Sequence, residues 1–288
     1  MYPPVSLVLS SGGARGVAHI GVIEELERQG FEIKSIAGSS MGALVGGIYA
    51  SGNLQVYREW MCKLDKKAVF NLIDFTLSTN GLVKGNKIIK ELKNIVPDEK
   101  IEDLPIYFSA IATDIKNKKE IIFDKGSLYE AIRASISIPT VFKPCKQNGM
   151  VLIDGGVLNP LPINRVKRMK DDIVIVVNVN AAPQNEIHDL IKKRRNDDND
   201  DLNYLSFLMK KGFQYLPKMP ENQLNYYTLL SQSGSLMIQQ LSAMTLEMYK
   251  PDILIQIPIN SYGPYHFYKS EEIIEVGAIA TQIGRAHV

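Results

Sequence analysis

The chain has 288 residues, of which 45% are hydrophobic and 22% charged, and its net charge is +2. This balance is typical of a globular protein with enough apolar material for a core, and the small net charge argues against a nucleic-acid-binding protein. No apolar run reaches the length of a membrane span, and no leader peptide is evident, although a leader that was already removed is compatible with this start. Cys62 and Cys145, the two cysteines, are too few for a disulfide framework.

The first half of the chain alternates strand and helix patterns. Residues 5–11 form a continuous apolar run, which is typical of a strand buried on both faces. Residues 17–30 have apolar side chains at helical spacing, and a second strand and helix are predicted over 31–38 and 41–52. This βαβα order predicts parallel strands that are covered by helices.

Further elements are predicted as far as residue 180. Asn148 and Gly149 lie between two strand-like runs and indicate a tight hairpin, and Ser127 is a candidate N-cap. Helices are predicted over 53–76, 86–95 and 127–137, strands over 104–115 and 119–126, and a buried strand over 172–180.

The last third of the chain begins with a change of composition. A basic block beside an acidic one, "KKRRNDDNDD", indicates a surface loop, and helical patterns resume at 202–216 and 222–250. A late strand over 252–258 and a helix over 271–284 can complete the first sheet. We therefore predict one domain over 1–288, with a variable loop and helical cap over 181–250.

A serine at a tight corner is the first candidate functional residue. Gly38-Ser39-Ser40-Met41-Gly42 matches the G-x-S-x-G nucleophile elbow, in which a strained strand-to-helix turn exposes the serine hydroxyl at the sheet edge. The predicted strand and helix on either side supply the required context. The alternative is a glycine-rich turn in which Ser40 merely caps the helix.

Ser40 needs a base to accept its proton. Ser40, Asp154 and His266 follow the chain order of an α/β-hydrolase triad, but that fold places several strands before the elbow, and here one strand precedes it. His266 lies among aromatic residues and His19 within the first helix, so both are expected to be packing or surface residues. Asp154 follows an apolar strand and precedes two glycines, so its carboxylate is expected to be exposed at a strand end.

A glycine-rich segment, residues 10–16 ("SSGGARG"), joins the first strand to the first helix. Its backbone amides can form an anion-binding nest near the elbow and stabilise a tetrahedral oxyanion. The rival interpretation is a dinucleotide site, which needs an acidic residue at the end of the second strand. That strand ends in Ile36-Ala37-Gly38 instead, and no Gly-Lys-Ser/Thr follows the loop to make a P-loop.

Gly-Gly-Ala-Arg-Gly, Gly-Ser-Ser-Met-Gly and Asp-Gly-Gly in this order resemble the patatin-like phospholipase family, over roughly residues 5–180. The resemblance implies a three-layer α/β/α sandwich with a mostly parallel central sheet and a Ser-Asp dyad without histidine. It assigns Ser40 as nucleophile and Asp154 as base. It also assigns the oxyanion hole to the backbone of Gly12, Gly13 and Ala14, and motif-supporting roles to Arg15, Gly16, Gly38, Gly42, Gly155 and Gly156.

One position departs from the pattern of the family. Ser11 stands where the family usually has glycine, and a serine is tolerated there if its φ is negative. Arg15 has two interpretations: it shapes the loop or meets an anionic head group, or it faces solvent in the first helical turn.

We expect a serine acyl hydrolase of lipid esters, of the phospholipase A or lysophospholipase type. No cofactor or metal is expected, since no cluster of ligands has suitable spacing. The expected partner is a phospholipid or another acyl ester, with peripheral membrane contact and no nucleic acid. The expected location is the cytoplasm or the membrane surface, or outside the cell if a leader was removed.

The alternatives are a carboxylesterase of soluble substrates with the same dyad, and a catalytically silent binding protein of the same fold. The helix predicted over 202–216 has a broad apolar face flanked by Lys210 and Lys211. It either packs on the domain or forms a cap that touches lipid.

Overall fold

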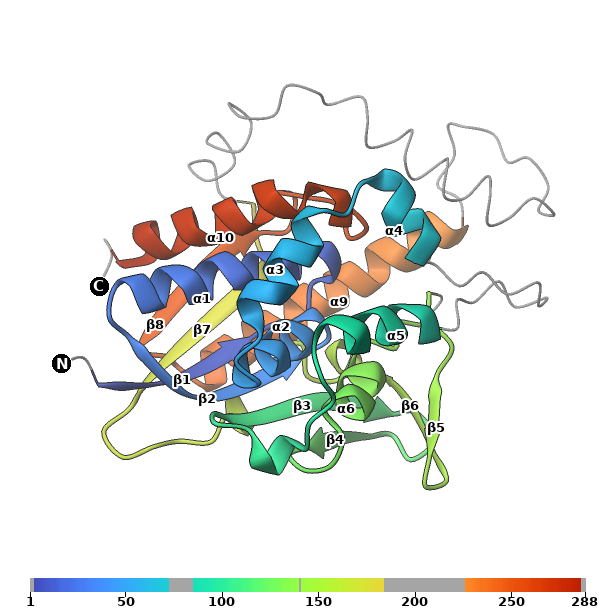
Figure 1. The fold of residues 1–288 in the computed structure, drawn as a ribbon, viewed down its shortest axis with the longest axis horizontal. Coiled ribbons are helices and arrows are strands. Elements are labelled where there is room, and N and C mark those ends of the chain that lie inside the picture. Colours follow the sequence, from blue (N-terminus) through green and yellow to red (C-terminus); the bar gives the residue numbers. More distant parts are fainter. Residues whose placement is uncertain (1–2, 73–84, 140, 184–225, 286–288) are drawn as a thin grey trace.

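The computed structural model describes residues 3–72, 85–139, 141–183 and 226–285 (Figure 1). Their centre is an eight-stranded, mostly parallel sheet in the order β5-β6-β3-β2-β1-β7-β8, with β4 paired to β3 outside this path. The strands are β1 (Pro4–Leu9), β2 (Glu32–Ser39), β3 (Tyr107–Asp114), β4 (Lys119–Phe123), β5 (Cys145–Gln147), β6 (Met150–Asp154), β7 (Ile173–Ala181) and β8 (Ile253–Pro258).

Helices cover both faces of this sheet and make a three-layer α/β/α fold. Leu7 and Leu9 of β1 belong to the core on one face, and Val8 belongs to the core on the other, as the two-residue period of a strand requires. The first face carries α1 (Ala18–Arg28), α2 (Met41–Ala50), α3 (Leu54–Cys62), α5 (Asn86–Ile95), α6 (Leu128–Ser135) and α10 (Ser270–Arg285), while α9 (Tyr226–Met248) packs on the second.

Strands β2 and β6 meet end to end on one edge of β3. β2 runs parallel to β3 and ends with Ser39 opposite Ile111, and β6 runs antiparallel to β3 and ends with Asp154 opposite Ala112. The other edge of β3 is taken by β4, which pairs with residues 110–114 and overlaps both contacts. The last residues of β2 and β6 are therefore brought together from opposite directions.

Most predicted elements are confirmed. α5 begins and ends as predicted, the Ser127 hydroxyl accepts a hydrogen bond from Glu130 N, and the hairpin turns at Asn148 and Gly149, which both have positive φ. The late strand also joins the sheet, since β8 pairs parallel with β7.

Several predicted boundaries were wrong. The strands predicted over 104–115 and 119–126 are shorter, at 107–114 and 119–123, and the last residues of the helix predicted over 53–76, 73–76, lie outside the described residues. The helix predicted over 53–76 is two helices, α3 and α4 (Lys66–Leu72), because the Asp65 side chain accepts a hydrogen bond from Ala68 N and starts a new helix. β1 ends at Leu9 rather than at residue 11, and Ser10 and Ser11 belong to the glycine-rich loop.

The helix predicted over 202–216 lies outside the described residues. Of the predicted cap over 181–250, the structure describes 181–183 and 226–250, and α9 contacts β7. The cap itself stays a prediction.

Candidate active site

Ser40 occupies the strained corner between β2 and α2. Its φ of 54° and ψ of −121° are rare for a residue with a side chain, and such values persist only where the surroundings enforce them. The flanking glycines allow close packing here. A Cβ on Gly38 would lie 2.4 Å from Gly42 O, and a Cβ on Gly42 would lie 2.2 Å from Leu9 O.

Asp154 lies directly beside this serine. The Ser40 hydroxyl donates a hydrogen bond of 2.5 Å to Asp154 Oδ2, while Gly156 N donates one of 2.7 Å to Asp154 Oδ1. Both side chains are buried, with residue exposures of 3% for Ser40 and 5% for Asp154, although the sequence suggested that both were exposed.

Burial sets the protonation of the Asp154 carboxyl. Loss of water raises its pKa to about 7, and the hydrogen bonds from Ser40 and Gly156 oppose that rise. A carboxyl with a pKa near neutrality exchanges a proton readily at physiological pH, as a general base requires. The pair therefore has the geometry and the basicity needed to activate a serine.

The glycine-rich loop packs against residues next to both members of this pair. A Cβ on Gly16 would lie 2.5 Å from Met41 Cβ, behind the nucleophile, and a Cβ on Gly156 would lie 2.9 Å from Ser11 Oγ. Because neither position has room for a side chain, the loop fits closely against the elbow and against the turn that follows Asp154.

Two of the three predicted oxyanion amides are available. Among the described residues, the amides of Gly12 and Gly13 have no hydrogen-bond partner, whereas Ala14 N donates to Pro264 O at 2.9 Å. Gly13 has a φ of 57°, which favours glycine, and a Cβ there would lie 2.8 Å from Pro264 O. Any oxyanion site in this loop therefore rests on Gly12 and Gly13.

Arg15 is buried, with 7% exposed, so the solvent-facing interpretation was wrong. Its guanidinium donates to Val179 O at 3.3 Å, to Tyr262 O at 3.1 Å and to Asn180 Oδ1 at 3.1 Å. Burial lowers its pKa to about 10, which still leaves it charged at neutral pH. Arg15 thus ties the glycine-rich loop to the end of β7 and to the segment before α10.

Ser11 fits the loop without strain, since its φ is not positive. Its backbone is held at both ends: Ser11 N donates to Pro160 O, and Ser11 O accepts from Asn180 Nδ2 at 2.6 Å. Its hydroxyl is buried and has no hydrogen-bond partner among the described residues.

The two histidines in the described part of the chain, His19 and His266, take no part in the Ser40–Asp154 contact. His266 Nδ1 accepts a hydrogen bond from Gly263 N at 2.9 Å, next to the loop that holds Ala14. His19 is fully buried in α1, where Nε2 lies 2.9 Å from Ser10 O and burial lowers the pKa to about 4. A neutral His19 therefore donates to Ser10 O and supports the loop from behind.

Sequence reasoning missed two serines at the end of α6. Ser135 Oγ accepts a hydrogen bond from Ser40 N at 2.9 Å, and Ser137 O accepts one from Asp154 N at 3.0 Å. The available signal was a pair of serines in "AIRASISIPTVFKP", a stretch that resembles the patatin-like family between the elbow and the aspartate, but the sequence assigned no role to either serine.

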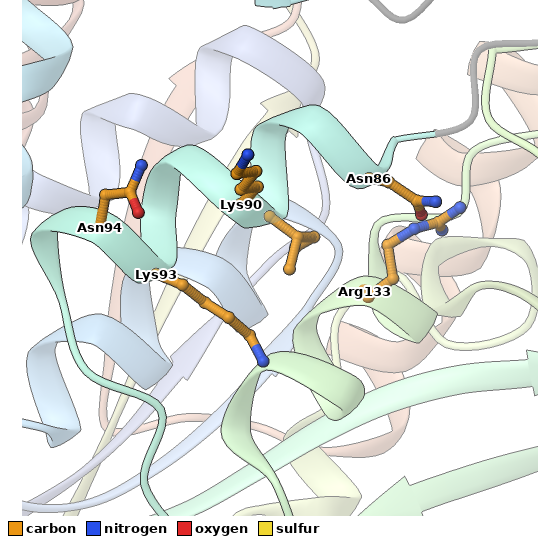
Figure 2. Close-up of a pocket in the computed structure, with 6 residues that line it drawn as sticks. Asn86, Lys90, Lys93, Asn94 and Arg133 are labelled. Carbon is orange, nitrogen blue, oxygen red and sulfur yellow. The ribbon is translucent and has the colours of Figure 1, made fainter.

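A separate pocket of about 290 Å³ lies between α5 and α6. Figure 2 shows Arg133 of α6 beside Asn86 at the start of α5, with Lys93 directed down toward α6. The lining comprises Asn86, Ile89, Lys90, Lys93, Asn94 and Arg133, and it includes neither Ser40 nor Asp154. Lys93 is already paired with Asp98 at 2.8 Å.

The described part of the chain lacks two kinds of feature. It contains no group of three or more His, Cys, Asp or Glu side chains that could hold a metal ion. None of its helices is both long enough and apolar enough to cross a membrane.

Comparison with known proteins gives these features a context. The chain is 44% identical over 180 residues to an uncharacterised NTE family protein of Mycobacterium tuberculosis, covering 62% of this chain and 50% of that protein. It is 29% identical over 287 residues to lysophospholipase NTE1 of Candida albicans and 27% identical over 284 residues to that of Saccharomyces cerevisiae. These matches cover 95% of this chain but only 19% and 16% of those proteins.

Among solved structures, VipD of Legionella pneumophila is similar with a TM-score of 0.46 and 14% identity, over 99% of this chain and 67% of VipD. The chain spans half the length of its mycobacterial relatives and under a fifth of the fungal ones. The family model described as patatin-like phospholipase matches residues 7–166. Since this match covers more than half of the chain, the chain belongs to the patatin-like phospholipase family.

Proposed function

We propose that this protein is a serine acyl hydrolase that cleaves fatty-acyl esters of phospholipids or lysophospholipids. The observation that carries the proposal is the 2.5 Å hydrogen bond between the Ser40 hydroxyl and a buried carboxylate whose pKa is raised to about 7. The names of the family and of the fungal relatives support lipid as the substrate class.

The first half of the reaction acylates Ser40. Its oxygen attacks the ester carbonyl carbon, and its proton passes to Asp154, to which it is already hydrogen-bonded. The oxyanion that forms is stabilised by the amides of Gly12 and Gly13, which are the donors of the loop without another partner among the described residues. The intermediate then collapses: the bond to the alcohol oxygen breaks, and the leaving alcohol takes the proton from Asp154.

The second half releases the fatty acid. Asp154 removes a proton from a water molecule, and the water oxygen attacks the acyl carbon. A second oxyanion forms, and its collapse breaks the bond to Ser40 Oγ, which recovers the proton from Asp154. The fatty acid leaves, and the resting hydrogen bond between Ser40 and Asp154 is restored.

Helix α9 favours a lipid aggregate over a soluble ester as the source of substrate. Its packed side includes Leu246, which contacts the core on this face of the sheet, and Ser242, which is 1% exposed and donates to Ile238 O within the helix. Its exposed side carries large apolar residues beside Gln232 and Gln240, and α9 has no charged residue before Glu247. We call Leu230, Met237, Met244 and Met248 the α9 apolar face, and their exposures are 45%, 65%, 51% and 70%.

Several large apolar side chains exposed along one helix are suited to an apolar partner rather than to water. Val157 and Leu158, which directly follow the Asp154–Gly156 turn, are also 41% and 44% exposed. We therefore include in the proposal a peripheral contact between this protein and the surface of a membrane or micelle. Such a contact brings the substrate to the enzyme before the ester reaches Ser40.

The proposal is tested with the purified chain. A fluorophosphonate probe should label Ser40, as identified by peptide mapping, and mass spectrometry should detect free fatty acid released from mixed phospholipid and lysophospholipid micelles. A folded protein that the probe does not label and that releases no fatty acid would favour a binding protein of this fold. Labelling with hydrolysis of short soluble esters alone would favour a carboxylesterase.

A further inference from the structure

The end of α6 holds both Ser40 and Asp154 in place. The Ser135 side chain and the Ser137 carbonyl come from one short segment, residues 135–137, which we call the α6 clamp. Ser40 N donates to Ser135 Oγ at 2.9 Å, and Asp154 N donates to Ser137 O at 3.0 Å. Two groups that are 114 residues apart are thus fixed to a common support.

The Ser135 hydroxyl makes two hydrogen bonds. Besides accepting from Ser40 N, it donates to Ile111 O at 2.5 Å, on the strand where β2 and β6 meet. Its side chain is fully buried, so no water can replace these bonds if the hydroxyl is removed. One side chain therefore connects the backbone of the strained residue to the central strand.

The strain at Ser40 makes this support necessary. A residue with these dihedral angles is strained, and its backbone amide must be paired when it is buried. Without a partner for Ser40 N, the turn can relax toward a commoner conformation, and this would move Oγ away from Asp154. A displacement of about 1 Å in a reacting group can lower a rate on the order of 100-fold.

The clamp is itself fixed from behind. Arg133 donates to Ser137 Oγ at 2.6 Å and to Lys143 O at 2.9 Å, and Ser137 Oγ donates to Arg133 O at 2.8 Å. These bonds anchor the segment to the body of α6 and to the chain that follows it.

We propose that Ser135 is a positioning residue: its hydroxyl holds the strained backbone of Ser40 so that Oγ stays within hydrogen-bonding distance of Asp154. The proposal rests on the acyl-hydrolase function only for its kinetic consequence. Ser135 touches neither substrate nor the reacting oxygen, so its effect should fall on kcat and leave KM unchanged.

The test compares three variants on a short soluble ester, with active sites counted by fluorophosphonate titration. Ser135→Ala should lower kcat roughly ten- to a hundredfold and change KM less than twofold. Ser135→Thr keeps the hydroxyl but adds a methyl group to a full site, so it should lose thermal stability yet retain kcat. Ser35→Ala is the control, because the Ser35 hydroxyl is buried in β2 without a partner among the described residues.

Two kinetic results would overturn the proposal. The first is a Ser135→Ala variant that keeps the kcat of the unmodified protein. The second is an equal loss of kcat in Ser135→Ala and Ser135→Thr, in proportion to the fall in their melting temperatures. A crystal structure of Ser135→Ala tests the positioning even if the chain hydrolyses nothing. An unchanged Ser40–Asp154 hydrogen bond would then refute the proposal, whereas an inactive unmodified protein would refute only the proposed function.

Discussion

Ser40 and Asp154 share a hydrogen bond because the strands before them end opposite consecutive residues of β3. Ser39 pairs with Ile111 and Asp154 pairs with Ala112, on one edge of the strand. The backbone of β3 therefore sets the separation of the two side chains before any side-chain contact forms. Changes to this site can be predicted from that arrangement.

The first prediction concerns the pair itself. Ser40→Ala and Asp154→Asn should each lower ester hydrolysis on the order of 10⁴-fold or more, because a nucleophile and its base act as one unit. His266→Ala should keep most of the activity, since its Nδ1 binds Gly263 N rather than Ser40. Steady-state kinetics on one soluble ester measures all three variants. A His266→Ala enzyme as inactive as Ser40→Ala would restore the triad.

The second prediction concerns pH. Because only the ionised Asp154 can accept the proton of Ser40, kcat/KM should fall about tenfold per pH unit below a midpoint near pH 7. Burial is the main cause of this high pKa, so the midpoint should stay near 7 with substrates of different leaving groups. A rate that is flat from pH 5 to 8 would exclude Asp154 as the base.

The third prediction links the same carboxyl to stability. A folded-state pKa above the unfolded value means that folded Asp154 holds its proton between about pH 4 and 7 while the unfolded chain has lost it. The free energy of unfolding therefore decreases as pH rises through this range. Asp154→Asn has no charge to bury, so it should raise the melting temperature, and by more at pH 8 than at pH 5. Calorimetry at both values checks this, and an equal shift at both would contradict it.

The fourth prediction concerns the glycine-rich loop. Gly13→Ala should lower kcat on the order of 10²–10³-fold and change KM much less, because an oxyanion donor acts mainly in the transition state. Gly126→Ala is the matched control, since Gly126 also has a positive φ but a Cβ there meets nothing within 4 Å. If Gly13→Ala instead raised KM by a similar factor and left kcat unchanged, the loop would be a binding site for an anionic group of the substrate and not an oxyanion hole.

The fifth prediction concerns the α9 apolar face. Replacing Met237 and Met244 together by serine should lower hydrolysis of phospholipid vesicles about tenfold or more, with activity on a short soluble ester unchanged. Each methionine is more than half exposed, so little core packing is lost. Gln232→Ser on the same helix serves as the control. If both activities fell together with the melting temperature, the face would be part of the fold.

The sequence by itself determined the elements and the chemistry they carry. Apolar runs and helical spacing located β1, α1, β2 and α2, and the glycines around Ser40 marked the strand-to-helix corner, because these signals are local. The motifs singled out Ser40 and Asp154 for the same reason. A strand end followed by small residues can be recognised from the local sequence, without knowing which other segments pack against it.

Only the tertiary structure decided which groups meet. The sequence favoured Asp154 over His266 as the partner of Ser40, but only the shared edge of β3 brings the Asp154 carboxyl to the Ser40 hydroxyl. The sequence did not decide whether Arg15 faces solvent or shapes the loop, and the structure shows its guanidinium buried against the end of β7. The sequence also carried no sign that Ser135 holds the backbone of Ser40. The physical reason is common to all three: hydrogen bonds between distant segments depend on strand pairing and packing, which local periodicity does not encode.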